Sequence, residues 1–173
     1  MSKIVQIGTP VLREKALPVP QELFGTKELS QMITAMEQAL DAEADGVALA
    51  APQIALPYRI FIVRHDRMTP IKEGEDPRPA DVSVFINPSI IKRSRKSAEV
   101  DEGCLSVRGQ YGTTKRFLRV TVRASDMSGK TFERGAGGLL AQAFQHEIDH
   151  LDGVLFIDHA TNLLNVQKIE GGE

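Results

Sequence analysis

One stretch of the sequence decides the fold: residues 137–151 read GGLLAQAFQHEIDHL. Its apolar side chains recur at three- and four-residue steps, the spacing of one face of an α-helix. They are Leu139, Leu140, Ala143, Phe144, Ile148 and Leu151. Gly153 follows at a position where helices commonly end. A helix this apolar favours burial against a sheet, so the stretch predicts a late, buried α-helix.

The predicted helix carries two histidines, His146 and His150. Four residues apart, they lie on one helix face about one turn from each other, where two imidazoles can bind one metal ion. Glu147 lies beside the first histidine, where its carboxylate can reach metal-bound water without binding the metal. A polar stripe on a surface helix would give the same motif. However, buried histidines and carboxylates need partners, which a metal supplies, so the apolar helix favours a metal site.

A catalytic zinc-type site usually has three protein ligands and leaves one position open for water. In metzincin proteases the third ligand is a histidine six residues after the second, but Phe156 occupies that position here. Thermolysin-like proteases use a glutamate about 20 residues further on, and Glu170 lies there. Because Glu170 is three residues from the end, in a region that usually frays, Cys104 is the better candidate. Gly103 beside this single cysteine allows a tight backbone approach.

The rest of the chain predicts an α+β fold. Residues 26–44 have the periodicity of an amphipathic helix, and a loop rich in proline, glycine and charge covers 68–81. Three segments have the composition or alternation of strands: 59–63, 82–91 and 118–123. We expect antiparallel or mixed β-sheets packed around the late metal-binding helix, with an amphipathic helix near the N-terminus. The length suits one domain over residues 1–173.

Composition limits the classes of partner. The chain has 21 basic and 23 acidic residues and a net charge of −2, which gives no general reason to expect nucleic-acid binding. The basic run at 92–96 is read more simply as a solvated edge than as a docking patch. A single cysteine excludes an intramolecular disulfide and suits a reducing compartment. Without a secretory or transit signal, or an apolar stretch of roughly 20 residues, we expect a cytoplasmic protein and no membrane contact.

Three motifs carry a resemblance to a known family: GVALAAPQ at 46–53, EGCLS at 102–106 and QHEIDHL at 145–151. With these motifs in this order, and GTPVLR at 8–13, the sequence resembles the peptide deformylases over essentially its whole length. That family removes the formyl group from the N-terminal methionine of new polypeptides. The resemblance implies formyl-Met nascent peptides as partners and transient proximity to the ribosome. The sequence lacks the long C-terminal helix that some members use at the ribosome, so docking there is not expected.

By position, the resemblance implies that Cys104, His146 and His150 bind one divalent metal, for which Fe2+ is the family's usual ion. The same donors also suit Zn2+, Ni2+ or Co2+. A metal lowers the pKa of its bound water from 15.7 towards roughly 7. Glu147 is then implied as the acid–base that takes the water's proton and returns it to the leaving amine.

The resemblance also implies that Gln53 and the backbone N–H of Leu105 hold the formyl oxygen, where negative charge develops. Glu102 would be costly to bury without a partner, and we expect Arg116 to pair with it as structural support. The implied substrate-binding residues are Gly46, Val47, Ala48, Val100, Gly103, Leu139 and Ala143. Ordinary core packing explains Val47, Val100, Leu139 and Ala143 equally well.

Two positions depart from the family pattern. Ala48 stands where the family nearly always has glycine, and Tyr111 stands where many members have an arginine near the substrate. An added methyl group at Ala48 could crowd the peptide's path. These departures leave open a divergent hydrolase with an altered substrate, or a metal-binding paralogue without catalysis. A metalloprotease that cleaves internal amides is a further alternative.

Overall fold

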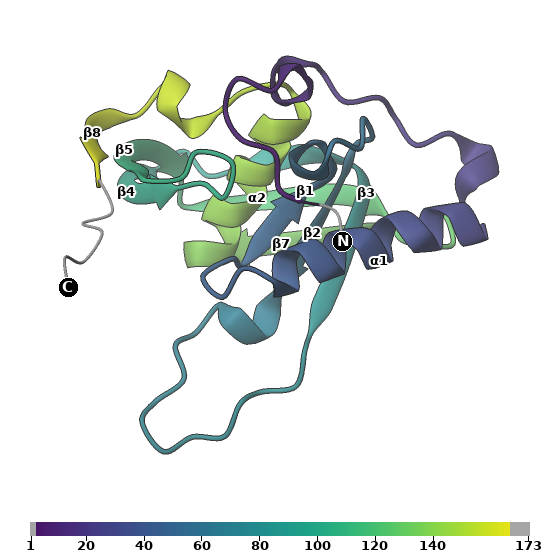
Figure 1. Ribbon diagram of the computed structural model, residues 1–173, viewed down its shortest axis with the longest axis horizontal. Coiled ribbons are helices and arrows are strands. Elements are labelled where there is room, and N and C mark those ends of the chain that lie inside the picture. Colours follow the sequence, from purple (N-terminus) through teal and green to yellow (C-terminus); the bar gives the residue numbers. More distant parts are fainter. Residues whose placement is uncertain (1–2, 167–173) are drawn as a thin grey trace, which may run out of the picture.

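The computed structural model describes residues 3–166. Within them the chain forms two α-helices, α1 (Lys27–Asp41) and α2 (Gly138–Leu151), and eight β-strands (Figure 1). The strands are β1 (Ala48–Ala50), β2 (Ile60–Arg64), β3 (Val82–Arg93), β4 (Ser97–Gly103), β5 (Gln110–Phe117), β6 (Arg119–Ser125), β7 (Thr131–Gly137) and β8 (Thr161–Asn165). Short 3-10 helices connect several of them, including η3 (Ala51–Ile54) directly after β1. No helix within the described residues combines the length and the apolar character that crossing a membrane requires.

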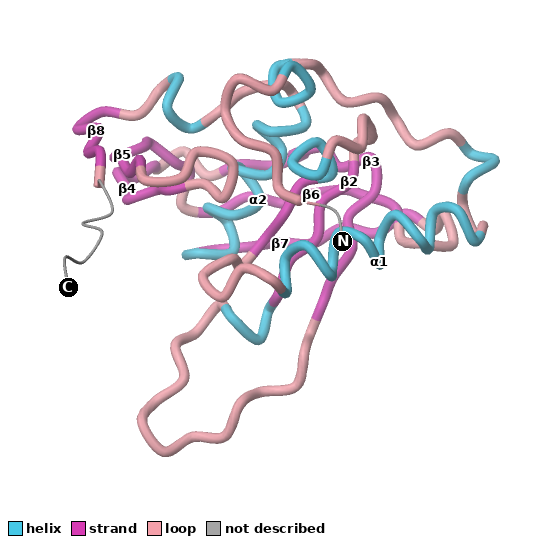
Figure 2. Tube along the Cα trace, viewed as in Figure 1, coloured by secondary structure: helices cyan, strands magenta, loops and turns pink. Residues whose placement is uncertain are grey.

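The strands form two separate sheets (Figure 2). The larger has the order β1-β2-β3-β6-β7 and the smaller the order β4-β5-β8. Every pair of neighbouring strands is antiparallel. The predicted α+β class with antiparallel sheets is therefore confirmed.

Strand β2, inside the larger sheet, is buried on both faces. Phe61 and Val63 belong to the apolar cluster that includes α2, whereas Ile60 and Ile62 belong to the cluster that includes α1. Alternate residues of a strand point to opposite faces, so this continuous apolar strand serves both clusters. Each such side chain contributes about 1.5–3 kcal/mol when fully buried. On the α2 side, the rings of Phe61 and Phe85 stack with centroids 4.6 Å apart.

Helix α1 occupies the segment in which the sequence predicts a helix. The side chain of Thr26 accepts a hydrogen bond from the N–H of Leu29 and so caps its first turn. Its buried face packs on the larger sheet and consists of Leu29, Ile33, Met36, Ala39 and Leu40.

Helix α2 lies where residues 137–151 predict it and contacts strands of both sheets. It ends at Leu151, and Gly153 follows with φ of 74°, a left-handed conformation. A Cβ at Gly153 would lie 2.6 Å from the carbonyl oxygen of Arg13, so only glycine fits this stop. The close approach fixes the N-terminal segment against the end of the helix.

Strand β3 is irregular at Asn87 and Pro88. The strand continues through this point, and its pairing with β6 shifts register between Ile86 and Ser89. Asn87 has φ of 51°, a conformation that asparagine tolerates better than most residues. Its side chain exchanges hydrogen bonds of 2.7 and 3.0 Å with the backbone of Val19. The irregularity therefore ties the N-terminal segment to the sheet.

The smaller sheet was not predicted. Segments 97–103 and 110–117 read SAEVDEG and QYGTTKRF, whose charges and glycines hide the alternation of a strand. The loop over 68–81 extends away from the body of the molecule, as Figure 1 shows. Glu170, the alternative ligand, lies outside the described residues.

Candidate metal centre

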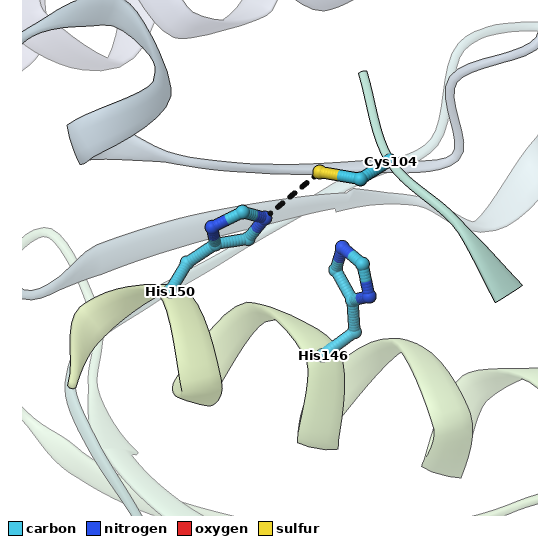
Figure 3. Close-up of side chains that lie close together, drawn as sticks. All are labelled: Cys104, His146 and His150. Carbon is cyan, nitrogen blue, oxygen red and sulfur yellow. Dashed lines mark hydrogen bonds between the residues drawn. The ribbon is translucent and has the colours of Figure 1, made fainter. Parts of the chain in front are cut away.

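Segments far apart in the sequence bring three side chains with metal-binding atoms together. Helix α2 supplies His146 and His150, and Cys104 follows the last residue of β4. Both imidazole rings extend from α2 towards the thiol (Figure 3). The ligand atoms all lie within 4.8 Å of one another, and Cys104 Sγ is 3.2 Å from His150 Nε2.

The chemistry and spacing of these atoms fit a metal ion. Two ligands of a tetrahedral ion, a nitrogen at ~2.1 Å and a sulfur at ~2.3 Å, lie about 3.6 Å apart. The 3.2 Å between Cys104 Sγ and His150 Nε2 is close to that spacing. Nδ1 of His150 is buried without a hydrogen-bond partner. Burial, and next the charge of His146, hold the pKa of His150 well below its usual value, so the ring is neutral as a ligand requires.

His146 is oriented by a buried ion pair. Its Nδ1 lies 2.5 Å from Glu102 Oε1, which leaves Nε2 for the cluster. Arg116 holds both oxygens of Glu102, with nitrogen–oxygen distances of 2.6 and 2.9 Å. Nη1 of Arg116 donates to Asp149 Oδ2 at 2.7 Å. Thr114 also donates to Glu102, so the carboxylate is fully engaged. The predicted pairing of Glu102 with Arg116 is present.

Opposing effects set the protonation of this network. Burial raises the pKa of Glu102, but hydrogen bonds from His146 and Arg116 outweigh it and hold the pKa well below its usual range. Burial lowers the pKa of His146, but hydrogen bonds to Cys104 and Glu102 outweigh it and raise the pKa well above its usual value. A metal bound at this site would displace that proton, because a ligating imidazole must be neutral.

Glu147 is a buried acid with one oxygen left over. Its side chain lines a cleft beside Cys104 and His146, and Oε2 is buried without a hydrogen-bond partner. Burial raises the pKa of Glu147 to about 7. A carboxyl group with this pKa can take up and release a proton near neutral pH.

Gln53 reaches the cluster from η3. The backbone N–H of Ala50 donates to its Oε1 at 2.8 Å, so the amide oxygen faces the backbone. Its Nε2 therefore points the other way, 3.2 Å from Ser106 Oγ and 3.7 Å from Cys104 Sγ. The amide presents a fixed hydrogen-bond donor beside the three candidate ligands.

Gln53, Cys104, His146 and Glu147 line a cleft of about 420 Å³, within the range of small-ligand pockets. Leu105 also lines it. All but one of the predicted substrate-binding residues line it too: Gly46, Val47, Ala48, Gly103, Leu139 and Ala143. Val100 is the exception. It lies two residues before Glu102 on β4, paired with Thr114, and the cleft wall of this strand begins at Asp101.

The sequence model of the family described as polypeptide deformylase matches residues 1–166. The chain belongs to the polypeptide deformylase family. A peptide deformylase of Heliobacterium modesticaldum is 42% identical over 160 residues, which cover 92% of this chain and 94% of that one. The chloroplastic peptide deformylase 1A of Solanum lycopersicum is 38% identical, and the match covers 91% of this chain but 59% of that protein.

Solved structures of this family have the same fold. A class I type b peptide deformylase from Acinetobacter baumannii, in complex with Met-Ala-Ser, superposes with a TM-score of 0.80. It is 31% identical, and the match covers 90% of this chain and 96% of that one. The family is one of metallohydrolases, in agreement with the Cys-His-His cluster.

Sequence reasoning missed two features of this site. Asp149 accepts a hydrogen bond from Arg116. The sequence alone assigns Asp149 no role, although it lies beside His150 in the motif at 145–151. Arg108 stands at the cleft wall and pairs with Asp45 at 2.9 Å and with Glu43. Nothing in the sequence links residues more than 60 positions apart, so only the fold reveals this second contact.

Proposed function

We propose that this chain removes the N-formyl group from the N-terminal methionine of nascent polypeptides and releases formate. Cys104, His146 and His150 would hold one divalent metal ion for this reaction. The observation that carries the proposal is the Cys-His-His cluster with the buried, unpartnered oxygen of Glu147 beside it. We also propose that residues 1–173 act as one catalytic domain.

The proposed ion is Fe2+, and Zn2+, Ni2+ or Co2+ suit the same donors. When bound, such an ion acts as a Lewis acid that increases the acidity of the attacking water. Glu102 and Arg116 are positioning residues in this scheme. They hold the His146 ring so that Nε2 would be free to bind the ion.

Glu147 moves the proton. Its free Oε2 takes a proton from the water that attacks the formyl carbon and then delivers it to the nitrogen of the methionine as the C–N bond breaks. The products are formate and a free amino terminus. The pKa of about 7 suits both halves of this transfer, because the group gains and loses the proton within one cycle.

Gln53 and the backbone N–H of Leu105 stabilise the formyl oxygen as negative charge builds on it. The hydrogen bond from Ala50 fixes the amide of Gln53, so its donor needs no reorganisation during the reaction. A donor of this kind is typically worth about 3 kcal/mol. Leu105 lines the same cleft, next to Cys104 in the chain.

The substrate's methionine side chain would lie among the apolar and small residues of the cleft. Val47, Ala48, Leu139 and Ala143 all line the cleft. The Acinetobacter relative binds Met-Ala-Ser, the product of such a reaction, which supports a peptide that continues beyond methionine. Cytoplasmic location and transient proximity to the ribosome belong to the same proposal.

The test is formate release from formyl-Met-Ala-Ser by protein loaded anaerobically with Fe2+. We expect turnover in the wild type and its loss in Glu147→Gln, with the metal content of the two proteins equal. Unformylated peptides with internal amide bonds serve as the control, and cleavage of those would favour a metalloprotease. A wild type that holds one metal ion per chain and releases no formate would favour a paralogue without catalysis.

A further inference from the structure

An exposed apolar row crosses the smaller sheet beside the cleft. Tyr111 of β5 pairs with Gly103 of β4 on one side and with Leu164 of β8 on the other. Side chains of directly paired residues lie on the same face of a sheet. Tyr111 is 47% exposed and Leu164 is 65% exposed. Val166 continues the row, because its N–H donates to the carbonyl oxygen of Gly109 at 2.7 Å and it is 58% exposed.

The row begins in the cleft and continues outside it. Gly103 and Tyr111 both line the cleft, whereas Leu164 does not. The tyrosine ring lies over the glycine, since a Cβ at Gly103 would be 2.8 Å from Cε1 of Tyr111. Because Gly103 has no side chain, the ring of Tyr111 forms the cleft wall at this point. Grouped exposed apolar side chains of this size mark binding surfaces more often than isolated ones do.

The distance from Gly103 to Leu164 corresponds to a few residues of an extended peptide. Neighbouring strands are about 4.8 Å apart, so Leu164 lies two spacings, about 10 Å, from Gly103. An extended peptide advances about 3.3 Å per residue, so roughly three residues cover this distance. A substrate whose first residue lies beside Gly103, and whose chain crosses β5 towards β8, would bring its third or fourth residue over the row.

We propose that Tyr111 and Leu164 form an apolar shelf that binds the third or fourth side chain of the substrate. The chain would therefore prefer nascent polypeptides with apolar residues at these positions. The inference rests on the proposed function. The occupant is the substrate and not a second copy of the chain, because the shelf is continuous with the cleft wall at Tyr111.

The test compares two peptides of equal length, formyl-Met-Ala-Leu-Leu and formyl-Met-Ala-Ser-Ser. Adjacent residues of an extended peptide point in opposite directions, so one leucine of the pair faces the shelf in either register. We expect the apolar peptide to have a kcat/KM about fivefold higher, equivalent to ~1 kcal/mol. Leu164→Ser should reduce this ratio to below about twofold, since it removes the outer half of the shelf.

Leu163→Ser is the matched control, because Leu163 is the preceding residue of β8 and is 45% exposed. Its side chain lies against Gly112, on the other face from Tyr111. This variant should keep the fivefold ratio. Equal kcat/KM for the two peptides in the wild type, or the same ratio in both variants, would overturn the shelf. So would self-association of the wild type that Leu164→Ser abolishes while the peptide ratio stays unchanged.

Failure of the proposed function is distinguishable from failure of the shelf. If neither peptide yields formate, binding of unformylated Met-Ala-Leu-Leu and Met-Ala-Ser-Ser is measured by tyrosine fluorescence. The chain has no tryptophan and two tyrosines, one of which is Tyr111. Tighter binding of the leucine peptide, lost in Leu164→Ser, would support the shelf without catalysis. Equal binding would refute it.

Discussion

Replacing Arg116 with methionine tests whether the buried ion-pair network holds the site together. Arg116 is 6% exposed and engages Glu102 and Asp149, and Glu102 is itself 6% exposed. The substitution keeps most of the side-chain volume but leaves Glu102 buried without its cation. Breaking a buried pair from one side costs about 3–5 kcal/mol, and we expect the free energy of unfolding to fall by that amount.

The assay is urea-induced unfolding of metal-free protein, followed by circular dichroism, with Arg123→Met as the control. Arg123 pairs with Glu133 at 2.8 Å, but both side chains are about half exposed. An exposed pair contributes only about 0–1 kcal/mol, so this variant should unfold at nearly the wild-type urea concentration. Equal losses in the two variants would refute the argument from burial.

The double variant Glu102→Gln/Arg116→Met identifies the cause of the loss. Without the glutamate, Arg116 has no buried carboxylate at position 102 to compensate. We therefore expect the double variant to be more stable than Arg116→Met alone. A double variant less stable than the single one would show that packing, and not charge, explains the loss. Metal affinity should fall about 10- to 100-fold in Arg116→Met, because the support of a ligating histidine is lost.

Three further predictions concern other parts of the molecule. The Arg64 guanidinium holds the pKa of Asp66 well below its usual range. The pair therefore stabilises the fold above pH ~3.9, and this stabilisation is lost as the pH falls towards the lowered pKa. Asp66→Asn should therefore weaken the fall in the free energy of unfolding between pH ~4 and 2, measured by urea titration at each pH, and an unchanged slope would contradict it. Gly153→Ala should lower the free energy of unfolding by at least about 1–3 kcal/mol in the same assay, because its φ is 74° and its Cβ would meet Arg13; no loss would show that the contact relaxes freely. Gln53→Ala should lower kcat for formyl-Met-Ala-Ser about 10²- to 10³-fold with metal content unchanged, and a normal kcat would remove Gln53 from the mechanism.

The sequence predicts the elements that have a strong period. Helix α2 lies where predicted because its apolar residues follow the 3.6-residue repeat, and Gly153 marks its end. The smaller sheet escapes prediction for the opposite reason. Strand β5 alternates buried and exposed positions, but its buried set includes Gly112, Thr114 and Arg116, which no hydropathy pattern identifies as inward-facing.

The candidate site divides in the same way. Helical spacing predicts His146 and His150 on one face, and Glu147 follows from its place beside His146. The cost of a buried charge predicts that Glu102 has a cationic partner, which the structure shows to be Arg116. Predicting the hydrogen bond between Arg116 and Asp149 requires knowledge of which face of β5 meets α2. Local sequence does not contain that information. The same holds for Val100, because the register of β4, in which it pairs with Thr114 of β5, leaves it outside the cleft lining.

Metal removal and replacement tests the central claim most directly. Protein stripped with a chelator should release no formate from formyl-Met-Ala-Ser, and one equivalent of Fe2+ per chain, added anaerobically, should restore turnover. Cys104→Ser should neither retain the ion nor recover activity, since it replaces the thiolate of the Cys-His-His cluster. Full activity in the stripped protein, or in Cys104→Ser without bound metal, would contradict the proposed metal centre.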